Sequence, residues 1–411
     1  MVFMPETYFV NDHRQGFREQ QDPELERLVP PDAGAGLAAP SATMSAVADD
    51  DTDLTPAEFV RWRREQVRRL KMRRELFPGL PENTVIYANF NQLYKIDIDI
   101  FRSWLEIIRR VPNAILWLLR FPPAGEMHLR RTAERLHGAE VAQRVVFTDV
   151  APKHQHIHRG RIADVFLDTP ECNAHTTAAD ILWSGTPLVT YPKYDFKMCS
   201  RVAASVAYAT GAWPPARVPA PEYDAAGRPM SNGLRLQATL PRLRDPLLLG
   251  HYMVVNSYQE YEDRAVQLGR GLHWDWVTLR APGASAAGGP IAAPASAAPA
   301  GATGVPAPTR GFPGDPPGLP AVSATASVAD LGFLPSRAAT THIFVPRGLA
   351  AQLRRQLFLT RDTMPLFNTV RWVRGLEHAF VQSLRRWRDA WDVNVARNLR
   401  EYEFVKQAAE R

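Results

Sequence analysis

The chain has 411 residues, 45% of them hydrophobic, and carries a formal net charge of +6. Its two cysteines exclude a disulfide-stapled secreted scaffold, and neither a signal peptide nor a run of about 18 apolar residues is visible. The excess charge is too small to indicate a nucleic-acid partner. We therefore expect a soluble intracellular protein of two or three domains, with no membrane span.

Two unlike segments precede the first regular pattern. Residues 21–57 are rich in Pro, Ala and Asp without periodicity, which predicts a disordered connector. Residues 58–80 predict a linker helix with eight basic residues between Arg61 and Arg74. These side chains could contact phosphate or an acceptor, but an apolar stripe that begins at Phe59 favours a helix whose basic face is solvated.

From Thr84 onward, apolar runs alternate with amphipathic segments, the pattern of an α/β protein with a doubly wound parallel sheet. We expect strands at residues 85–89, 114–119, 145–148, 164–168 and 188–191. We expect helices at residues 99–110, 126–137, 153–161, 176–184 and 200–210. Ligands of such sheets bind beyond the carboxyl ends of the strands. The loops there carry Gln92 and Lys95, Lys153, and His175, so these polar groups should converge on one edge.

The stretch from residue 151 to residue 187 (APKHQHIHRGRIADVFLDTPECNAHTTAADILWSGTP) carries most of the chemistry. Lys153, His156 and Arg159 recur every three residues and share one side of a helix. The helix that follows His175 opens with two threonines. Hydroxyl groups and unpaired backbone N–H groups at a helix start form an anion site. Asp180, one turn further on, could hold a ribose hydroxyl, so the stretch suits a nucleoside diphosphate.

The remaining chain is less regular. Residues 212–249, rich in Pro and Arg, predict a surface insertion, and residues 256–272 predict a helix that closes the lobe. Residues 281–342 are dominated by Ala, Gly and Pro and predict a disordered insert. Residues 343–411 should form C-terminal helices, at 347–359 and 366–392, that pack back on the fold.

Three features could be taken for other chemistry. Asp97 and Asp99 mimic a manganese-binding DxD motif, but Asp99 stands where a helix should begin and is a good N-cap. The histidines at 154, 156 and 158 point in different directions on a helix, so we expect no metal site. Cys172 has no evident base nearby, and we interpret it as structural.

Several separate motifs together carry a family resemblance. Besides residues 151–187, these are YANFNQLYKID at 87–97, RVPNAILWLLRF at 110–121, SRVAAS at 200–205, QEYED at 259–263 and PLFNT at 365–369. With them the chain resembles the nucleotide-binding lobe of the protein O-GlcNAc transferases, over roughly residues 84–211, 252–280 and 345–390.

The resemblance implies the C-terminal, Rossmann-like lobe of a two-lobed GT-B glycosyltransferase, at residues 81–280 with the insertion inside it. Residues 1–20 resemble the closing strand of the N-terminal catalytic lobe, and we interpret His13 there as structural. That lobe and the helical repeats that precede it in the family are expected partners, but are absent from this chain. The chain alone should bind the donor and transfer it negligibly.

The implied activity is inverting transfer of N-acetylglucosamine from UDP-GlcNAc to Ser/Thr hydroxyls of proteins in the cytoplasm and nucleus, without metal or cofactor. By resemblance, Lys95 and His175 are the catalytic residues. Donor contacts are implied for Gln92, Lys95, Ala151, Pro152, Lys153, His156, Arg159, His175, Thr176, Thr177 and Asp180. In this pattern Ala151, His156 and Arg159 surround the uracil.

Two alternatives stay open at this point. A related O-fucosyltransferase branch uses GDP-fucose, although it has Gly-Thr-Thr-Thr where this chain has Ala174-His175-Thr176-Thr177. The other alternative is a truncated, non-catalytic module that binds a UDP-sugar. The histidine and the APK motif at 151–153 favour the uridine donor.

Overall fold

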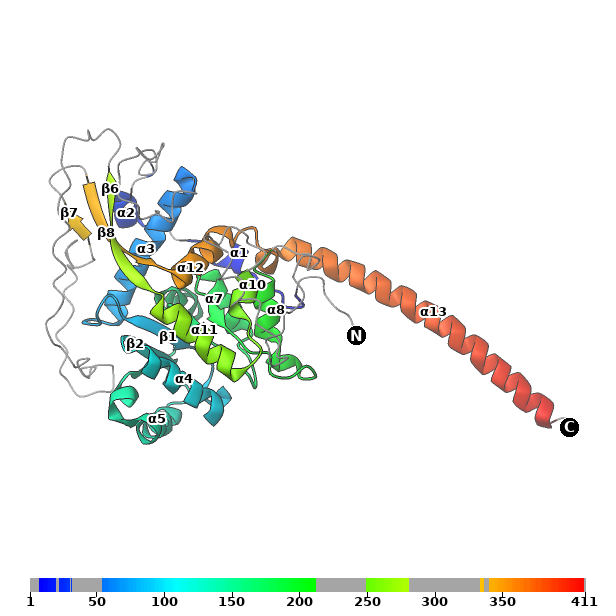
Figure 1. Ribbon diagram of the computed structural model, residues 1–411. Helices are drawn as coiled ribbons and strands as arrows, with labels where there is room; N and C mark the ends of the chain where they lie inside the picture. Colours follow the sequence, from blue (N-terminus) through cyan, green and yellow to red (C-terminus); the bar gives the residue numbers. More distant parts are fainter. Residues whose placement is uncertain are drawn as a thin grey trace, which may run out of the picture.

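A computed structural model describes residues 7–19, 22–29, 31, 54–211, 249–280, 333–335 and 340–409 (Figure 1). Residues 32–53 of the predicted connector, the surface insertion at 212–248 and most of the Ala/Gly/Pro-rich insert lie outside the described residues. Inside the connector predicted at 21–57, however, the helix α2 (Pro23–Leu28) buries Leu25 and Leu28 and contacts the helix that begins at Pro56, so the prediction of disorder was wrong there. No helix in the described part of the chain is long and apolar enough to cross a membrane.

A five-stranded parallel sheet organises the fold. Its strands are β1 (Val85–Asn89), β2 (Ala114–Leu119), β3 (Val145–Thr148), β4 (Val165–Leu167) and β5 (Leu188–Val189). They lie in the order β3-β2-β1-β4-β5, and every neighbouring pair is parallel. The predicted α/β class is confirmed. Nearly every strand residue is buried, because helices cover both faces of the sheet.

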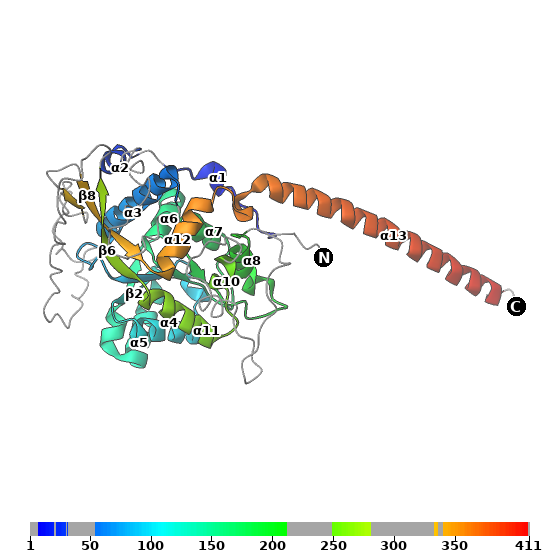
Figure 2. The ribbon, with the colours of Figure 1, turned by 45° about the horizontal axis from the view of Figure 1, so that its top comes forward.

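The helices form two layers. Figures 1 and 2 show one layer below the sheet, which holds α4 (Ile98–Arg110), α5 (Ala124–Gln143) and α11 (Tyr258–Arg270). The opposite layer holds α3 (Pro56–Leu76), α6 (Lys153–Arg159), α7 (Thr176–Trp183) and α12 (Leu349–Thr360). Two short helices, α8 (Val202–Tyr208) and α10 (Leu249–Met253), contact each other beside β5.

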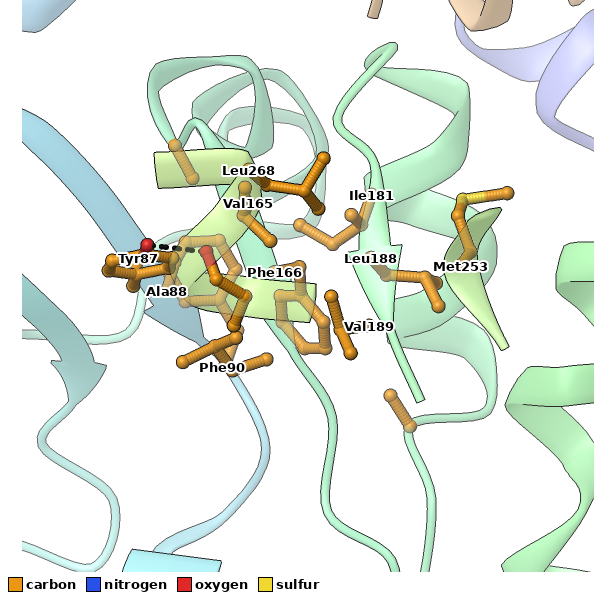
Figure 3. Packing of buried hydrophobic residues seen from close by; sticks show 14 of the residues in the cluster. Tyr87, Ala88, Phe90, Val165, Phe166, Ile181, Leu188, Val189, Met253 and Leu268 are labelled. Carbon is orange, nitrogen blue, oxygen red and sulfur yellow. Dashed lines mark hydrogen bonds between the residues drawn. The ribbon is translucent and has the colours of Figure 1, made fainter. Parts of the chain in front are cut away.

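Buried side chains of β1, β4 and β5 form the centre of the core. Figure 3 shows Phe90, Phe166 and Val189 packed side by side, with Ile181 of α7 and Leu268 of α11 closing over the strands. The Tyr87 hydroxyl donates to the Ala265 carbonyl at 2.7 Å, which ties the first strand to α11. The core therefore fixes the position of the carboxyl end of β1 relative to the carboxyl end of β4.

The cap of α4 differs from the expectation. Asp97, not Asp99, is the N-cap: its Oδ1 accepts from the backbone N–H groups of Asp99 at 2.9 Å and Ile100 at 3.0 Å. Asp99 is exposed, and its Oδ1 lies 3.6 Å from Arg102 Nη1. A carboxylate on the residue just before a helix can reach the unpaired N–H groups of the first turn. A carboxylate on a residue inside that turn does not reach them in the same way.

The prediction that the basic face of α3 is solvated was wrong. Arg63, Arg69 and Arg73 are buried. The Arg69 guanidinium pairs with the buried carboxylate of Asp164, and Arg73 Nη1 lies 3.3 Å from the same group. Arg69 Nε also donates to the Arg161 carbonyl at 2.8 Å. These arginines point inward because the turn before β4 presents carbonyl groups and a carboxylate that need donors.

A second sheet was not predicted. β6 (His273–Arg280), β7 (Phe333–Pro335) and β8 (Thr340–Arg347) form an antiparallel sheet in the order β6-β8-β7. β7 and the start of β8 fall inside the segment expected to be disordered. The indole of Trp274 stacks on Phe344 at 5.5 Å and lies under the Arg73 guanidinium, so the sheet contacts α3.

The C-terminal helices were predicted in part. α12 contacts α3 and α7, as expected. The next helix, α13 (Thr369–Ala409), is longer than predicted and projects away from the lobe (Figure 1). None of its side chains from Val370 to Asp389 is buried. The expectation that it packs back on the fold was wrong for this stretch.

Candidate functional site

The candidate site lies where the strand order reverses. The chain moves from β1 to β2 and β3 on one side, then returns to β4 and β5 on the other, so the loops after β1 and β4 separate at the carboxyl edge. Open α/β sheets bind ligands at this kind of crevice. Gln92 and Lys95 follow β1, and His175 with its threonines follows β4, so these two loops leave the same edge of the sheet.

Three hydrogen bonds join the carboxyl end of β1 and the loop after it to the carboxyl end of β4 and the loop after it. Asn89 Nδ2 donates to the Leu167 carbonyl at 2.6 Å. Asn91 Nδ2 donates to Thr169 Oγ1 at 2.8 Å. Lys95 Nζ donates to the Asn173 carbonyl at 2.9 Å. Because Asn173 is two residues before His175, the last bond holds the half-buried Lys95 side chain close to the start of α7.

A buried carboxylate, which sequence reasoning did not single out, fixes the turn after β4. Asp168 Oδ1 accepts from the Ala174 N–H at 2.6 Å, and its Oδ2 accepts from Thr190 Oγ1 at 2.7 Å. Burial raises the pKa of Asp168 to about 7, although these donors and Lys95 act in the opposite direction. An aspartate at the end of an otherwise apolar strand was the signal that could have identified it.

The start of α7 combines an imidazole with free backbone donors. His175 is the N-cap residue but its side chain makes no capping bond; Nε2 lies 3.4 Å from the Cys199 carbonyl. Burial lowers the pKa of His175, and the nearby Lys95 charge lowers it further, while the Cys199 contact raises it. Thr176 is exposed and Thr177 half-buried, and N–H groups at a helix start lack intrahelical acceptors. A cation, an imidazole and a helix N-terminus together suit an anionic ligand.

The loop and helix after β3 supply the other predicted residues. Ala151 is half-buried, Pro152 and Lys153 are exposed, and the His156 ring meets Phe90 edge-on at 5.6 Å. Burial lowers the pKa of His156, while the negative charge of Asp180 raises it. Among the described residues, the buried His156 Nδ1 has no hydrogen-bond partner.

Arg159 is engaged by the end of β3. Its Nη1 donates to the Asp149 carbonyl at 2.8 Å and its Nη2 to Thr148 Oγ1 at 2.6 Å. The guanidinium also lies 5.4 Å from the centroid of the Trp117 ring. It therefore stabilises the loop that presents Ala151, and a direct contact with a base stays a prediction.

Two further predicted residues contact the N-terminal segment. In the described part of the chain, the carboxylate of Asp180 bonds to His13 alone, whose Nε2 lies 2.7 Å from Asp180 Oδ1. Lys153 Nζ lies 5.1 Å from the ring centroid of Phe17. The described residues contain no group of three His, Cys, Asp or Glu side chains placed to hold a metal ion.

Fold and site together define an α/β lobe with a lysine ammonium group and a helix N-terminus at its strand-order reversal. In comparison with known proteins, the sequence model of glycosyl transferase family 41 matches residues 63–223 of this chain. The resemblance to the O-GlcNAc transferases is confirmed over the matching regions by the relatives below.

The chain is 45% identical over 190 residues to the probable UDP-N-acetylglucosamine–peptide N-acetylglucosaminyltransferase SEC of Arabidopsis thaliana, which covers 46% of this chain and 15% of that protein. It is 52% identical over 133 residues to the UDP-N-acetylglucosamine–peptide N-acetylglucosaminyltransferase of Caenorhabditis elegans, covering 32% of this chain and 11% of that protein. The chain thus spans a small part of the relatives it matches.

Among solved structures, a mutant of the Thermobaculum terrenum O-GlcNAc transferase is similar with a TM-score of 0.33 and 22% sequence identity. The match covers 47% of this chain and 31% of that one.

Proposed function

We propose that this chain is the donor-binding part of a protein O-GlcNAc transferase: it binds UDP-GlcNAc, whose sugar is transferred to Ser/Thr hydroxyls of intracellular proteins. Residues 81–280 would form the donor lobe of a two-lobed GT-B enzyme. The observation that carries the proposal is the bond from Lys95 Nζ to the Asn173 carbonyl, because it holds a fixed cation beside the N-terminus of α7.

Such an arrangement suits the chemistry of sugar transfer. When the bond between sugar and phosphate breaks, the leaving UDP gains negative charge. An ammonium group and backbone N–H groups held in place stabilise that charge more in the transition state than in the ground state. In the proposal, Lys95 and Gln92 contact the diphosphate together with Thr176 and Thr177, and no metal ion is needed.

The nucleoside would lie against the loop after β3. Ala151 and Pro152 would contact the uracil through the backbone, and the His156 ring would cover it, flanked by Arg159. Lys153 and Asp180 would hold the ribose. His175, beside Lys95, would contact the junction of sugar and phosphate.

Calorimetric titration of the purified chain with UDP tests the proposal. We expect binding that EDTA does not change, weaker binding of GDP, and clear weakening by Lys95→Met. The matched control is Lys71→Met, which removes a lysine of α3 that pairs with Glu24 at 2.7 Å. Absence of UDP binding would refute the proposal, and tighter binding of GDP would assign the donor to the guanosine class.

A further inference from the structure

The N-terminal segment contacts the donor site through a buried pair. His13 Nε2 lies 2.7 Å from Asp180 Oδ1, although 167 residues separate the two in sequence. Both residues are buried, with 2% and 8% of their surfaces exposed. The bond joins α1 (His13–Gly16) to α7, and no sequence pattern linked them.

A second contact of the same segment reaches the other residue assigned to the ribose. The Phe17 ring lies under Lys153 Nζ, and the Phe17 carbonyl accepts from Trp183 Nε1 at 2.9 Å. One short segment therefore supports both Asp180 and Lys153.

His13 lies between two hydrogen-bond partners. Asn11 Nδ2 donates to the Leu366 carbonyl at 2.7 Å, so its Oδ1 is the atom that faces His13 Nδ1, at 3.2 Å. The other ring nitrogen, Nε2, faces the carboxylate of Asp180. A hydrogen bond to a carboxylate is stronger than one between neutral groups.

Aromatic rings hold the imidazole in place. Its centroid lies 5.5 Å from that of Phe17, 6.0 Å from that of Trp183 and 5.5 Å from that of Phe367. Thr369 Oγ1 donates to the Asn11 carbonyl at 3.1 Å, which ties the segment to the start of α13. His13 therefore has little freedom to turn away from Asp180.

We propose that His13 is a positioning residue of the donor site. It holds Asp180 through Oδ1, so that Oδ2, which bonds to no residue in the described part of the chain, can accept from a hydroxyl of the ribose diol. The inference rests on the proposed function, because it takes Asp180 as a contact of the nucleoside.

A pair of substitutions separates hydrogen bonding from packing. His13→Phe keeps an aromatic ring in the cluster and removes both hydrogen bonds. His13→Gln keeps an N–H donor at about the position of Nε2. We expect UDP to bind about 10-fold more weakly to His13→Phe, the size typical for loss of a charge-assisted hydrogen bond, and within about 3-fold of normal to His13→Gln.

The readout specific to positioning is the ribose. 2′,3′-Dideoxy-UDP should bind both variants and the unaltered chain alike, because it lacks the hydroxyls that Asp180 would contact. In an Asp180→Asn background, His13→Phe should weaken UDP binding no further. Equal weakening for UDP and its dideoxy analogue, or additive losses with Asp180→Asn, would overturn the inference.

A measurement on the unaltered chain tests the pair without depending on whether the variants fold. Nitrogen-15 NMR should detect the hydrogen bond between His13 Nε2 and the Asp180 carboxylate, and a His13 ring without this bond would contradict the pair. If UDP does not bind at all, the proposed function fails while this measurement still tests the pair. If UDP binds and His13→Phe has no effect, the positioning role alone fails.

Discussion

Lys95 Nζ donates to the Asn173 carbonyl at 2.9 Å and so joins the loop after β1 to the turn that precedes α7. The bond crosses the place where the strand order reverses. A lysine after a strand is ordinarily solvated, whereas this one is half-buried and held beside the helix N-terminus by a backbone group.

The first prediction concerns that lysine. In the active enzyme, Lys95→Met should lower turnover with UDP-GlcNAc by about 100–1000-fold, the range found for loss of a donor to developing charge. The Michaelis constant should change less, because the cation acts chiefly on the leaving group. Steady-state kinetics with an acceptor peptide measures both constants. Near-normal turnover would exclude the leaving-group role, and Lys71→Met should behave as the unaltered enzyme.

The second prediction concerns Asp168 and pH. Because burial raises its pKa to about 7, the folded state binds a proton that the unfolded chain releases near its ordinary pKa of 3.8. This contribution to stability is complete below about pH 4 and is lost as the pH rises towards about 7, at up to ~1.4 kcal/mol per pH unit. Asp168→Asn keeps an acceptor for the Ala174 N–H and should flatten that part of the profile.

Urea unfolding between pH 4 and pH 8 measures this effect as the difference between variant and unaltered chain. Asp195→Asn is the control, because Asp195 is exposed. Identical pH profiles for Asp168→Asn and the unaltered chain would show that the Asp168 carboxyl does not take up a proton on folding.

The third prediction concerns the buried charges under α3. Asp164 accepts from the Ile86 N–H at 2.7 Å and pairs with Arg69 and Arg73. Asp164→Ala should lower the free energy of unfolding by about 3–5 kcal/mol, because it leaves buried guanidinium groups without their counter-charge. Asp99→Ala removes an exposed partner of Arg102 and should change it by less than about 1 kcal/mol. Denaturant titration distinguishes the two, and similar small losses would mean that the buried cations find other acceptors.

The fourth prediction compares two phenylalanines. Phe367 is fully buried against Trp183, at a ring distance of 4.9 Å, whereas Phe380 on α13 is 63% exposed. Phe367→Ala should cost about 3–5 kcal/mol of stability. Phe380→Ala should change stability by no more than about 0.5 kcal/mol. A large loss for Phe380→Ala would show that this face of α13 is covered in solution.

The sequence by itself determined the parallel sheet and the place of the site. β1, β2 and β3 were predicted with the bounds they have, because strands covered on both faces are continuous apolar runs ended by turn residues. The site was predicted to lie in the loops that carry Lys95 and His175, because ligands bind at the carboxyl ends of parallel strands.

Tertiary structure alone decided the features that depend on contacts between distant segments. Whether an arginine of α3 is solvated or pairs with Asp164 depends on what packs against the helix. The residue pattern of α3 alone does not predict this. The antiparallel pairing of β6 with β8 joins segments that lie far apart in the sequence, since Arg280 pairs with Thr340 and His273 with Arg347. The hydrophobic pattern within either segment does not predict which distant strand it pairs with. The bond between His13 and Asp180 exists only because the folded lobe brings an N-terminal segment against α7.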